Sequence, residues 1–89
     1  MERIVTVVPE DGLHARPASK FVEMANSFDS DIQLGRADDG DLVPAASMLA
    51  VTGLGVAADE DVKLVAEGDD AEAALDALED ILSTPESEL

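Results

Sequence analysis

The sequence predicts an α+β fold in which helices cover one face of a four-stranded antiparallel sheet, with elements in the order β-α-β-β-α-β-α. Two kinds of apolar spacing alternate along the chain: every second residue in the strand segments, and every third or fourth residue in the helical ones. Asp38-Asp39-Gly40 supplies a turn between two adjacent strand segments. The 89 residues suffice for a single domain, 1–89, whose core is too small to enclose a deep substrate cavity.

The N-terminal half is expected to form a strand, a helix and a hairpin. Residues 4–8 are Ile-Val-Thr-Val-Val, a β-branched run that is typical of a largely covered strand. Residues 15–28 predict the first helix, because their apolar side chains recur on one helical face. These apolar positions are Ala18, Phe21, Val22, Ala25 and Phe28. Residues 31–36 alternate as a second strand, which pairs across the turn with a short strand around residues 42–43.

A short helix and a fourth strand are expected next. Ser47 can cap the N-terminus of the helix with its hydroxyl, and the helix continues through Val51. Gly53 and Gly55 would end it, because glycine readily adopts the left-handed backbone found at helix C-termini. The strand follows over residues 62–66, where apolar and charged residues alternate.

The last helix is expected to begin at Asp69 and Glu72, which form a variant of the capping box, and to stop before Pro85. Its outer face carries acidic residues four positions apart, whose repulsion typically costs about 0.2–0.5 kcal/mol per pair unless salt screens it. Burial of the opposite face must therefore stabilise this helix. That face consists of Ala71, Ala74, Leu75, Leu78, Ile81 and Leu82.

The composition excludes several kinds of site. The chain contains no cysteine, which rules out disulfides, thiolate metal sites and cysteine nucleophiles. Its single histidine leaves only carboxylates as further metal ligands, so no metal and no cofactor are expected. The N-terminus does not resemble a signal peptide, and the longest uncharged stretch, 42–58, is interrupted by Pro44 and two glycines. We therefore expect a cytoplasmic protein without a transmembrane segment.

The formal net charge of −16 restricts the partners. Nucleic acids and anionic membrane surfaces are excluded, because their phosphates would be repelled. The excess of acidic residues also needs an explanation of its own. At molar ionic strength the Debye length is about 3 Å, so repulsion among carboxylates is screened while they keep the protein hydrated. We therefore expect the chain to come from a halophile.

The segment with the clearest chemistry is Gly-Leu-His-Ala-Arg-Pro-Ala at residues 12–18, between the first strand and the first helix. Pro17 is tolerated in a first helical turn, where amide N–H groups have no partner within the helix and attract anions. A neutral imidazole at His14 is nucleophilic at about pH 7, and the Arg16 guanidinium offers two donors to phosphate oxygens. The pattern indicates a histidine that is transiently phosphorylated.

This heptapeptide closely resembles the active-site segment of the HPr family, the histidine-containing phosphocarriers of the phosphoenolpyruvate-dependent sugar phosphotransferase system (PTS). The resemblance covers essentially the whole chain and implies an open-faced β-sandwich. It implies that Enzyme I phosphorylates His14 on Nδ1, that Arg16 assists, and that Ala15 and Pro17 start the helix. The phosphoryl group would then pass to an EIIA domain or to the phosphocarrier subunit of a dihydroxyacetone kinase. The chain would be a monomeric carrier and not an enzyme.

Ser47 lies in a second segment, residues 46–51, that resembles the regulatory serine segment of the family. In some members of the family a dedicated kinase phosphorylates this serine and weakens the transfer from Enzyme I. Here Ala46 and Ala50 replace a lysine and a glycine that are common in the family. A helix cap without a regulatory role is therefore the simpler interpretation of Ser47.

Charge is distributed unevenly along the sequence. Residues 12–28 contain two cations and one acid, whereas residues 59–89 contain twelve acids and one lysine. The active segment is therefore expected to lie outside the acidic coat. The resemblance implies that donor and acceptor both dock on the short helix, so we expect an apolar patch beside His14. The residues of this docking patch are Ser47, Met48, Leu49 and Val51.

Two other functions are weighed against the carrier. One is a regulatory binding module that has the same fold but does not transfer phosphate; the presence of His14 and Arg16 argues against it. The other is a small hydrolase in which Ser19, His14 and an acid form a triad. The chain lacks a nucleophile elbow and room for a pocket, which argues against the hydrolase.

We expect the folded state to require salt. Desalting removes the screening between carboxylates, so the protein should unfold at low ionic strength and refold when molar salt is restored. Circular dichroism recorded against salt concentration measures this transition. A free energy of unfolding that stays the same after desalting would remove the halophile explanation of the charge.

Overall fold

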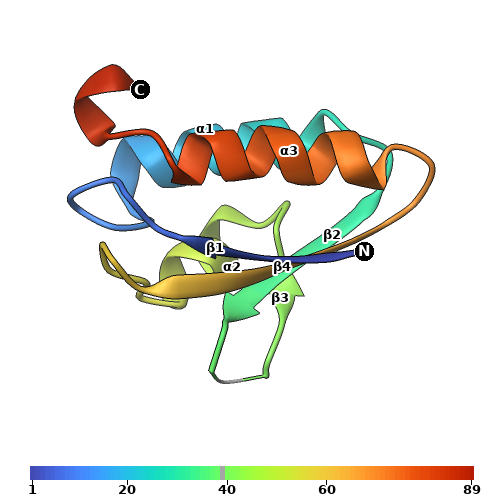
Figure 1. The fold of residues 1–89 in the computed structure, drawn as a ribbon, viewed down its shortest axis with the longest axis horizontal. Helices are drawn as coiled ribbons and strands as arrows, with labels where there is room; N and C mark the ends of the chain where they lie inside the picture. Colours follow the sequence, from blue (N-terminus) through green and yellow to red (C-terminus); the bar gives the residue numbers. More distant parts are fainter. Residues whose placement is uncertain (39) are drawn as a thin grey trace.

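The structure is a computed structural model that describes residues 1–38 and 40–89, and it has two layers (Figure 1). Its elements are β1 Glu2–Thr6, α1 Ala15–Asn26, β2 Asp31–Arg36, β3 Val43–Pro44, α2 Met48–Gly53, β4 Asp61–Glu67, α3 Ala71–Leu82 and the 3-10 helix η1 Glu86–Glu88. The strands form one antiparallel sheet in the order β1-β4-β2-β3, and α1 and α3 cover one of its faces. The predicted α+β class and element order are confirmed. Asp39, in the predicted turn, lies outside the described residues.

β1 is an edge strand that pairs with β4 and is covered on one face. A strand is present where one was predicted, but it spans Glu2–Thr6 and not residues 4–8. The prediction that it is largely covered is wrong, because Ile4 is 55% exposed. A β-branched run does not by itself distinguish one covered face from two. Beyond the strand, the amide of Val8 donates to the Leu82 carbonyl at 2.8 Å, so the chain turns toward the end of α3.

The predicted hairpin is confirmed by its register. Leu34 of β2 lies opposite Val43 of β3, and Gln33 lies opposite Pro44. β3 is short and forms the other edge of the sheet, where a proline that lacks an amide donor is tolerated. β4 lies in the centre between β1 and β2, and it extends one residue beyond the predicted range 62–66 at each end.

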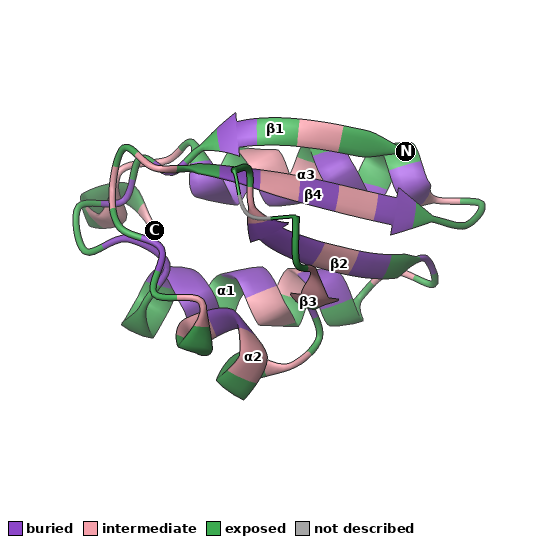
Figure 2. Cartoon of the chain, turned by 90° about the horizontal axis from the view of Figure 1, so that it is seen from below, coloured by how far each residue is buried: buried purple, intermediate pink, exposed green. Residues whose placement is uncertain are grey.

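The core lies between the sheet and the two long helices (Figure 2). The predicted inner face of α3 is confirmed in full, because all six of its residues are buried. The fully buried Phe21 of α1 is the largest core side chain, whereas Val22 of the same helix and Phe28, beyond its end, are only partly buried and pack against the core. The helix ends at Asn26, two residues before the predicted end at 28.

The predicted cap of α3 is wrong, and the carboxylate concerned has another role. Asp70, and not Asp69, precedes the helix, and its side chain caps nothing in α3. Instead it accepts hydrogen bonds from the amides of Asp29 and Ser30, both at 2.9 Å, and from the Ser30 hydroxyl. These bonds, that of the hydroxyl first, hold the pKa of Asp70 below its usual range. The carboxylate thereby ties the start of α3 to the loop that follows α1.

The turn before α1 depends on Gly12. Its φ of +74° lies in the left-handed region that favours glycine. A Cβ at this position would overlap the Val56 carbonyl oxygen and lie 2.8 Å from the Ala57 Cα. The Gly12 amide closes the turn by donating to the Pro9 carbonyl at 2.9 Å, and the fully buried Leu13 donates its amide to the Val56 carbonyl at 3.0 Å. The turn therefore lies directly against the loop between α2 and β4.

Replacing Asp70 by alanine should lower the free energy of unfolding, because the α1–β2 loop loses its acceptor. The folded-state pKa of Asp70 is depressed, so its contribution is complete above the pKa of the unfolded carboxyl and is lost as pH falls through the lower folded value. Urea unfolding in molar salt at neutral and acidic pH should show a difference between wild type and variant that shrinks on acidification. The exposed neighbour Asp69 provides the control. An equal loss of stability in Asp69→Ala would contradict the role of Asp70 as the acceptor for this loop.

Gly12→Ala should destabilise the protein, because the left-handed backbone alone costs a residue with a side chain about 1–2 kcal/mol and the overlap with the neighbouring loop adds to this cost. Gly53→Ala is the matched control, since Gly53 is the last residue of α2 and, apart from its chain neighbours and the backbone of its own helix, nothing lies within 4 Å of a Cβ there. The control should keep or raise stability, by up to about 1 kcal/mol. Thermal unfolding in molar salt compares the two, and similar melting temperatures would refute the packing argument.

Candidate functional site

His14 lies on the exposed turn that leads from β1 to α1. It is the N-cap residue of α1, with extended backbone angles of φ −133° and ψ 165°, and its ring forms no capping hydrogen bond with the helix. The residue before it, Leu13, is fully buried. An imidazole in this position is anchored through the backbone of a core residue while its ring nitrogens remain accessible from solvent.

The chain enters α1 through an unusual conformation at Ala15, which has a φ of +49°. Residues with a side chain rarely occupy this left-handed region, and here it turns the extended backbone of His14 into the helix. The Ala18 amide then donates to the His14 carbonyl at 3.4 Å, and the buried Pro17 follows inside the first turn. The predicted helix start at Ala15 and Pro17 is confirmed. The amides of Ala15 and Arg16 lie in the turn where a helix offers no carbonyl partner.

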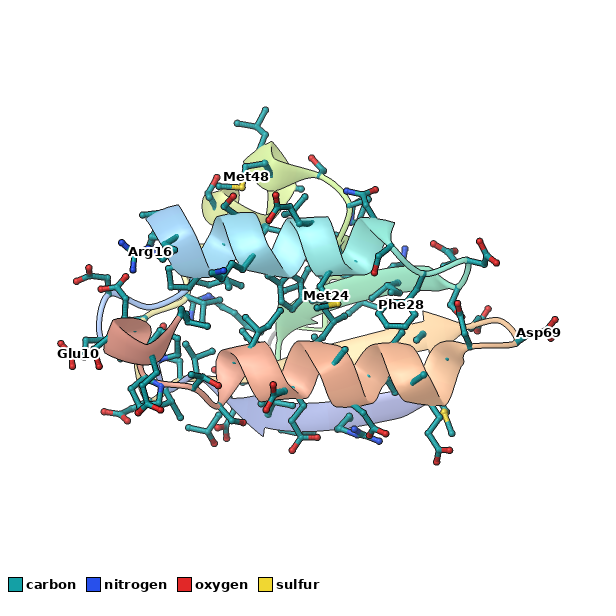
Figure 3. The ribbon with its side chains drawn as sticks, turned by 90° about the horizontal axis from the view of Figure 1, so that it is seen from above. Glu10, Arg16, Met24, Phe28, Met48 and Asp69 are labelled. Carbon is teal, nitrogen blue, oxygen red and sulfur yellow. The ribbon has the colours of Figure 1, made fainter. Side chains whose placement is uncertain are left out.

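Arg16 is exposed at the same end of α1, but its surroundings differ from the expectation (Figure 3). It lines a surface hollow of about 350 Å³ together with Ala15, Glu10, Glu86 and Ser87. The prediction that the active segment lies outside the acidic coat is therefore wrong. Glu10 comes from the preceding turn, whereas Glu86 belongs to η1 near the other end of the chain, where no local pattern in the sequence could connect it to Arg16.

The acidic residues around this hollow affect one another. The pKa of Glu86 lies above its usual range, mainly because the carboxyl is partly desolvated and also because Asp11 and Glu10 add negative charge nearby. Arg16 acts in the opposite direction. An incoming phosphate group would thus meet the guanidinium and these carboxylates together, and molar salt would screen the repulsion from the carboxylates.

The helix α2 packs against α1 and carries the second group of predicted residues (Figure 2). The predicted cap is confirmed, because the Ser47 hydroxyl accepts a hydrogen bond from the Ala50 amide at 3.2 Å. Leu49 is 84% exposed and Met48 is 40% exposed, as expected for a docking patch. The prediction that Val51 belongs to this patch is wrong, because Val51 is fully buried on the inner face of α2.

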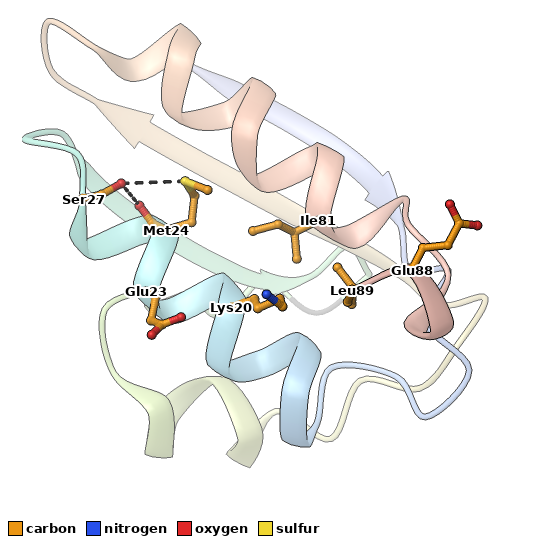
Figure 4. Close-up of a pocket in the computed structure, with 7 residues that line it drawn as sticks. All are labelled: Lys20, Glu23, Met24, Ser27, Ile81, Glu88 and Leu89. Carbon is orange, nitrogen blue, oxygen red and sulfur yellow. Dashed lines mark hydrogen bonds between the residues drawn. The ribbon is translucent and has the colours of Figure 1, made fainter.

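A separate groove of about 400 Å³ lies on the helical side of the molecule (Figure 4). The Ser27 hydroxyl donates to the Met24 carbonyl at its edge, at 2.6 Å. The groove is lined by Lys20, Glu23, Met24, Ser27, Ile81, Glu88 and Leu89. Neither His14 nor Arg16 lines this groove, although it is larger than the hollow at Arg16. The groove is therefore separate from the predicted phosphorylation site. This agrees with a site that works on the surface of the protein.

Other kinds of site receive no support from the described residues. Within 1–38 and 40–89, no three histidine, aspartate or glutamate side chains gather where they could hold a metal ion. In the same part of the chain, none of the helices has both the length and the hydrophobicity needed to span a bilayer. Ser19, the nucleophile of the hydrolase alternative, is exposed on α1 outside both hollows.

Comparisons with known proteins agree with this arrangement. A family model described as the PTS HPr component phosphorylation site matches residues 1–84. A phosphocarrier protein HPr of Haloferax volcanii is 86% identical over 87 residues, which cover 98% of this chain and 98% of that protein. A phosphocarrier protein HPr of Streptomyces coelicolor is 44% identical over 88 residues, which cover 99% of this chain and 94% of that protein.

Solved structures lead to the same family. The crystal structure of a phosphocarrier protein HPr from Bacillus anthracis has a TM-score of 0.86 at 36% identity, with 92% of this chain and 95% of that chain covered. The high identity to the Haloferax volcanii protein is consistent with the halophilic origin expected from the charge. Because the family model and these relatives match nearly the full length, and the fold matches as well, this chain belongs to the HPr family of PTS phosphocarriers.

Proposed function

We propose that this chain accepts a phosphoryl group on His14 from Enzyme I and passes it to an EIIA domain or to the phosphocarrier subunit of a dihydroxyacetone kinase. It would act in the cytoplasm as a monomeric, single-domain carrier, and not as an enzyme. One observation carries the proposal. The imidazole of the only histidine is exposed, forms no capping hydrogen bond, and lies two residues before Arg16 at the start of α1. Membership of the HPr family supports the carrier role.

The transfer requires a nucleophile, alignment and positive charge, and little other chemistry from the protein. A ring nitrogen of His14, Nδ1 by analogy with the family, supplies the electron pair of the new nitrogen–phosphorus bond. The bond between phosphorus and the donor breaks, and its electron pair leaves with the donor. Arg16 and the first-turn amides of α1 would stabilise the charge on the phosphoryl oxygens. The same exchange with an acceptor then frees His14.

Docking of the two partners is assigned to α2. Leu49 and Met48 expose apolar surface that a small soluble domain would otherwise bury. Methionine adapts to differently shaped surfaces, which suits a carrier that must meet a donor and an acceptor in turn. Ser47 lies at the start of this helix, where its cap is sufficient reason for a serine. If a kinase modified it, the phosphate would replace the cap and add charge beside the docking residues.

A regulatory binding module that transfers no phosphate is the alternative. Such a module would need α2 as a docking surface, but it would need neither an accessible imidazole nor a cation beside it. Among the described residues, His14 and Arg16 take part in no side-chain hydrogen bond or ion pair that would give them a structural task. Their exposure therefore favours the carrier.

Incubation with Enzyme I and phosphoenolpyruvate in molar salt should label the wild type with acid-labile phosphate and leave His14→Ala unlabelled. Arg16→Met should still be labelled, but about a hundredfold more slowly, because one preorganised charge donor is lost. Lys20→Met, which removes another cation of α1, should behave as wild type. Label that persists in His14→Ala would move the site, and a wild type without label would favour the binding module.

A further inference from the structure

We propose that Arg36, on β2, is a positioning residue for phosphoryl transfer at His14. It touches neither the imidazole nor the hollow at Arg16. Instead it holds the loop between α2 and β4, which in turn holds the residues that precede His14. The inference rests on the proposed function of His14 and adds to it a residue that lies outside the two segments singled out in the sequence, 12–18 and 46–51.

The Arg36 guanidinium binds three acceptors of this loop at once. Nη1 donates to Oε2 of Glu60 at 2.7 Å, and Nη2 donates to the carbonyls of Gly55 at 2.7 Å and Leu54 at 3.2 Å. The side chain is 30% exposed, so it is partly sheltered from water. The planar fork of arginine suits such an arrangement, whereas the single ammonium group of lysine does not reproduce it.

Glu60, the acidic partner of Arg36, forms further hydrogen bonds within and beside this loop. Its second oxygen, Oε1, accepts from the Ala57 amide at 2.7 Å, and its backbone carbonyl accepts from the Val7 amide at 2.9 Å. The Ala57 amide, followed by Arg36, holds the pKa of Glu60 below its usual range. Both ends of the loop are thus fixed, one by the arginine fork and the other by this carboxylate.

The clamped loop is the surface on which the histidine turn rests. The Val56 carbonyl follows Gly55 directly in the chain and accepts from the Leu13 amide at 3.0 Å. Gly12 approaches Val56 so closely that a Cβ would not fit. A continuous series of hydrogen bonds and contacts therefore runs from the Arg36 guanidinium to the amide of Leu13, the residue before His14.

These contacts between Arg36 and the histidine turn should control how the His14 imidazole is aligned with the incoming phosphoryl group. A nucleophile must approach phosphorus on the side opposite the leaving group, and a displacement of about 1 Å can cost about a hundredfold in rate. Arg16 can stabilise the phosphoryl oxygens only when His14 presents the group beside it. Loosening the loop would therefore slow the transfer without removing any group that contacts phosphate.

Arg3 provides a matched control. It is also a partly sheltered arginine, 27% exposed, and it also holds acidic partners: Asp76 at 2.6 Å and Glu79 at 3.0 Å. Its ion pairs join β1 to α3 and do not involve the clamped loop. Loss of either arginine removes comparable side-chain interactions, but only Arg36 is connected to the histidine turn.

The test compares Arg36→Met with Arg3→Met in the full chain, in molar salt. We expect Arg36→Met to lower the single-turnover rate of transfer from Enzyme I by about tenfold to a hundredfold. It should also raise the hydrogen-exchange rate of the Leu13 amide, which loses the support of its acceptor loop. Arg3→Met should change the transfer rate less than twofold and should keep Leu13 protected, apart from any change in global stability.

The outcomes separate the two proposals. If both variants transfer phosphate and protect Leu13 equally well, the role of Arg36 is refuted while the role of His14 stands. A wild type that takes no label would refute the proposed function, and the inference with it. If Arg36→Met does not fold, Arg36→Lys and Arg3→Lys give the same comparison. Lysine keeps the charge, but its single nitrogen cannot replace the two guanidinium nitrogens that bind Glu60 and the two carbonyls at the same time. Slower transfer and faster Leu13 exchange are again expected in Arg36→Lys alone.

Discussion

The contact between the turn before α1 and the loop after α2 is the constraint on which the candidate site depends. Leu13 is buried and its amide donates a hydrogen bond to the Val56 carbonyl, whereas His14, the next residue, is exposed. A small domain without a deep cavity can orient a surface nucleophile only if the adjacent backbone is fixed in its core. Gly12 makes this approach possible, and Arg36 with Glu60 holds the opposite side of the contact.

Because α1 and α3 lie side by side on one face of the sheet, the end of the chain lies beside the candidate site. α3 runs back toward the beginning of α1, so η1 ends beside Arg16 (Figure 3). The C-terminal segment thus brings Glu86 to the hollow that also contains Glu10. In a protein with a formal net charge of −16, the cation proposed to stabilise phosphate lies beside carboxylates. We therefore expect salt to screen the charges at the site as well as those of the whole fold.

Two carboxylates show that an acidic residue can bind loops together as well as hydrate the surface. Asp70 accepts hydrogen bonds from the loop after α1, and Glu60 accepts them from Arg36 and Ala57. Both have lowered pKa values for this reason. The composition alone cannot separate these structural acids from the solvating ones, because the difference lies in which distant donors the fold brings to each carboxylate.

Features that depend on neighbours along the chain could be predicted from the amino-acid sequence: the inner faces of α1 and α3, the hairpin, the Ser47 cap and the histidine at a helix start. Periodicity, turns and caps act over a few residues, so they can be recognised without a structure. Four other features became visible only in the three-dimensional fold: β1 is covered on one face, Val51 is buried, Asp70 binds the loop after α1, and acidic residues lie beside Arg16. These depend on packing between segments far apart in the sequence, and local patterns contain no information about which distant groups meet.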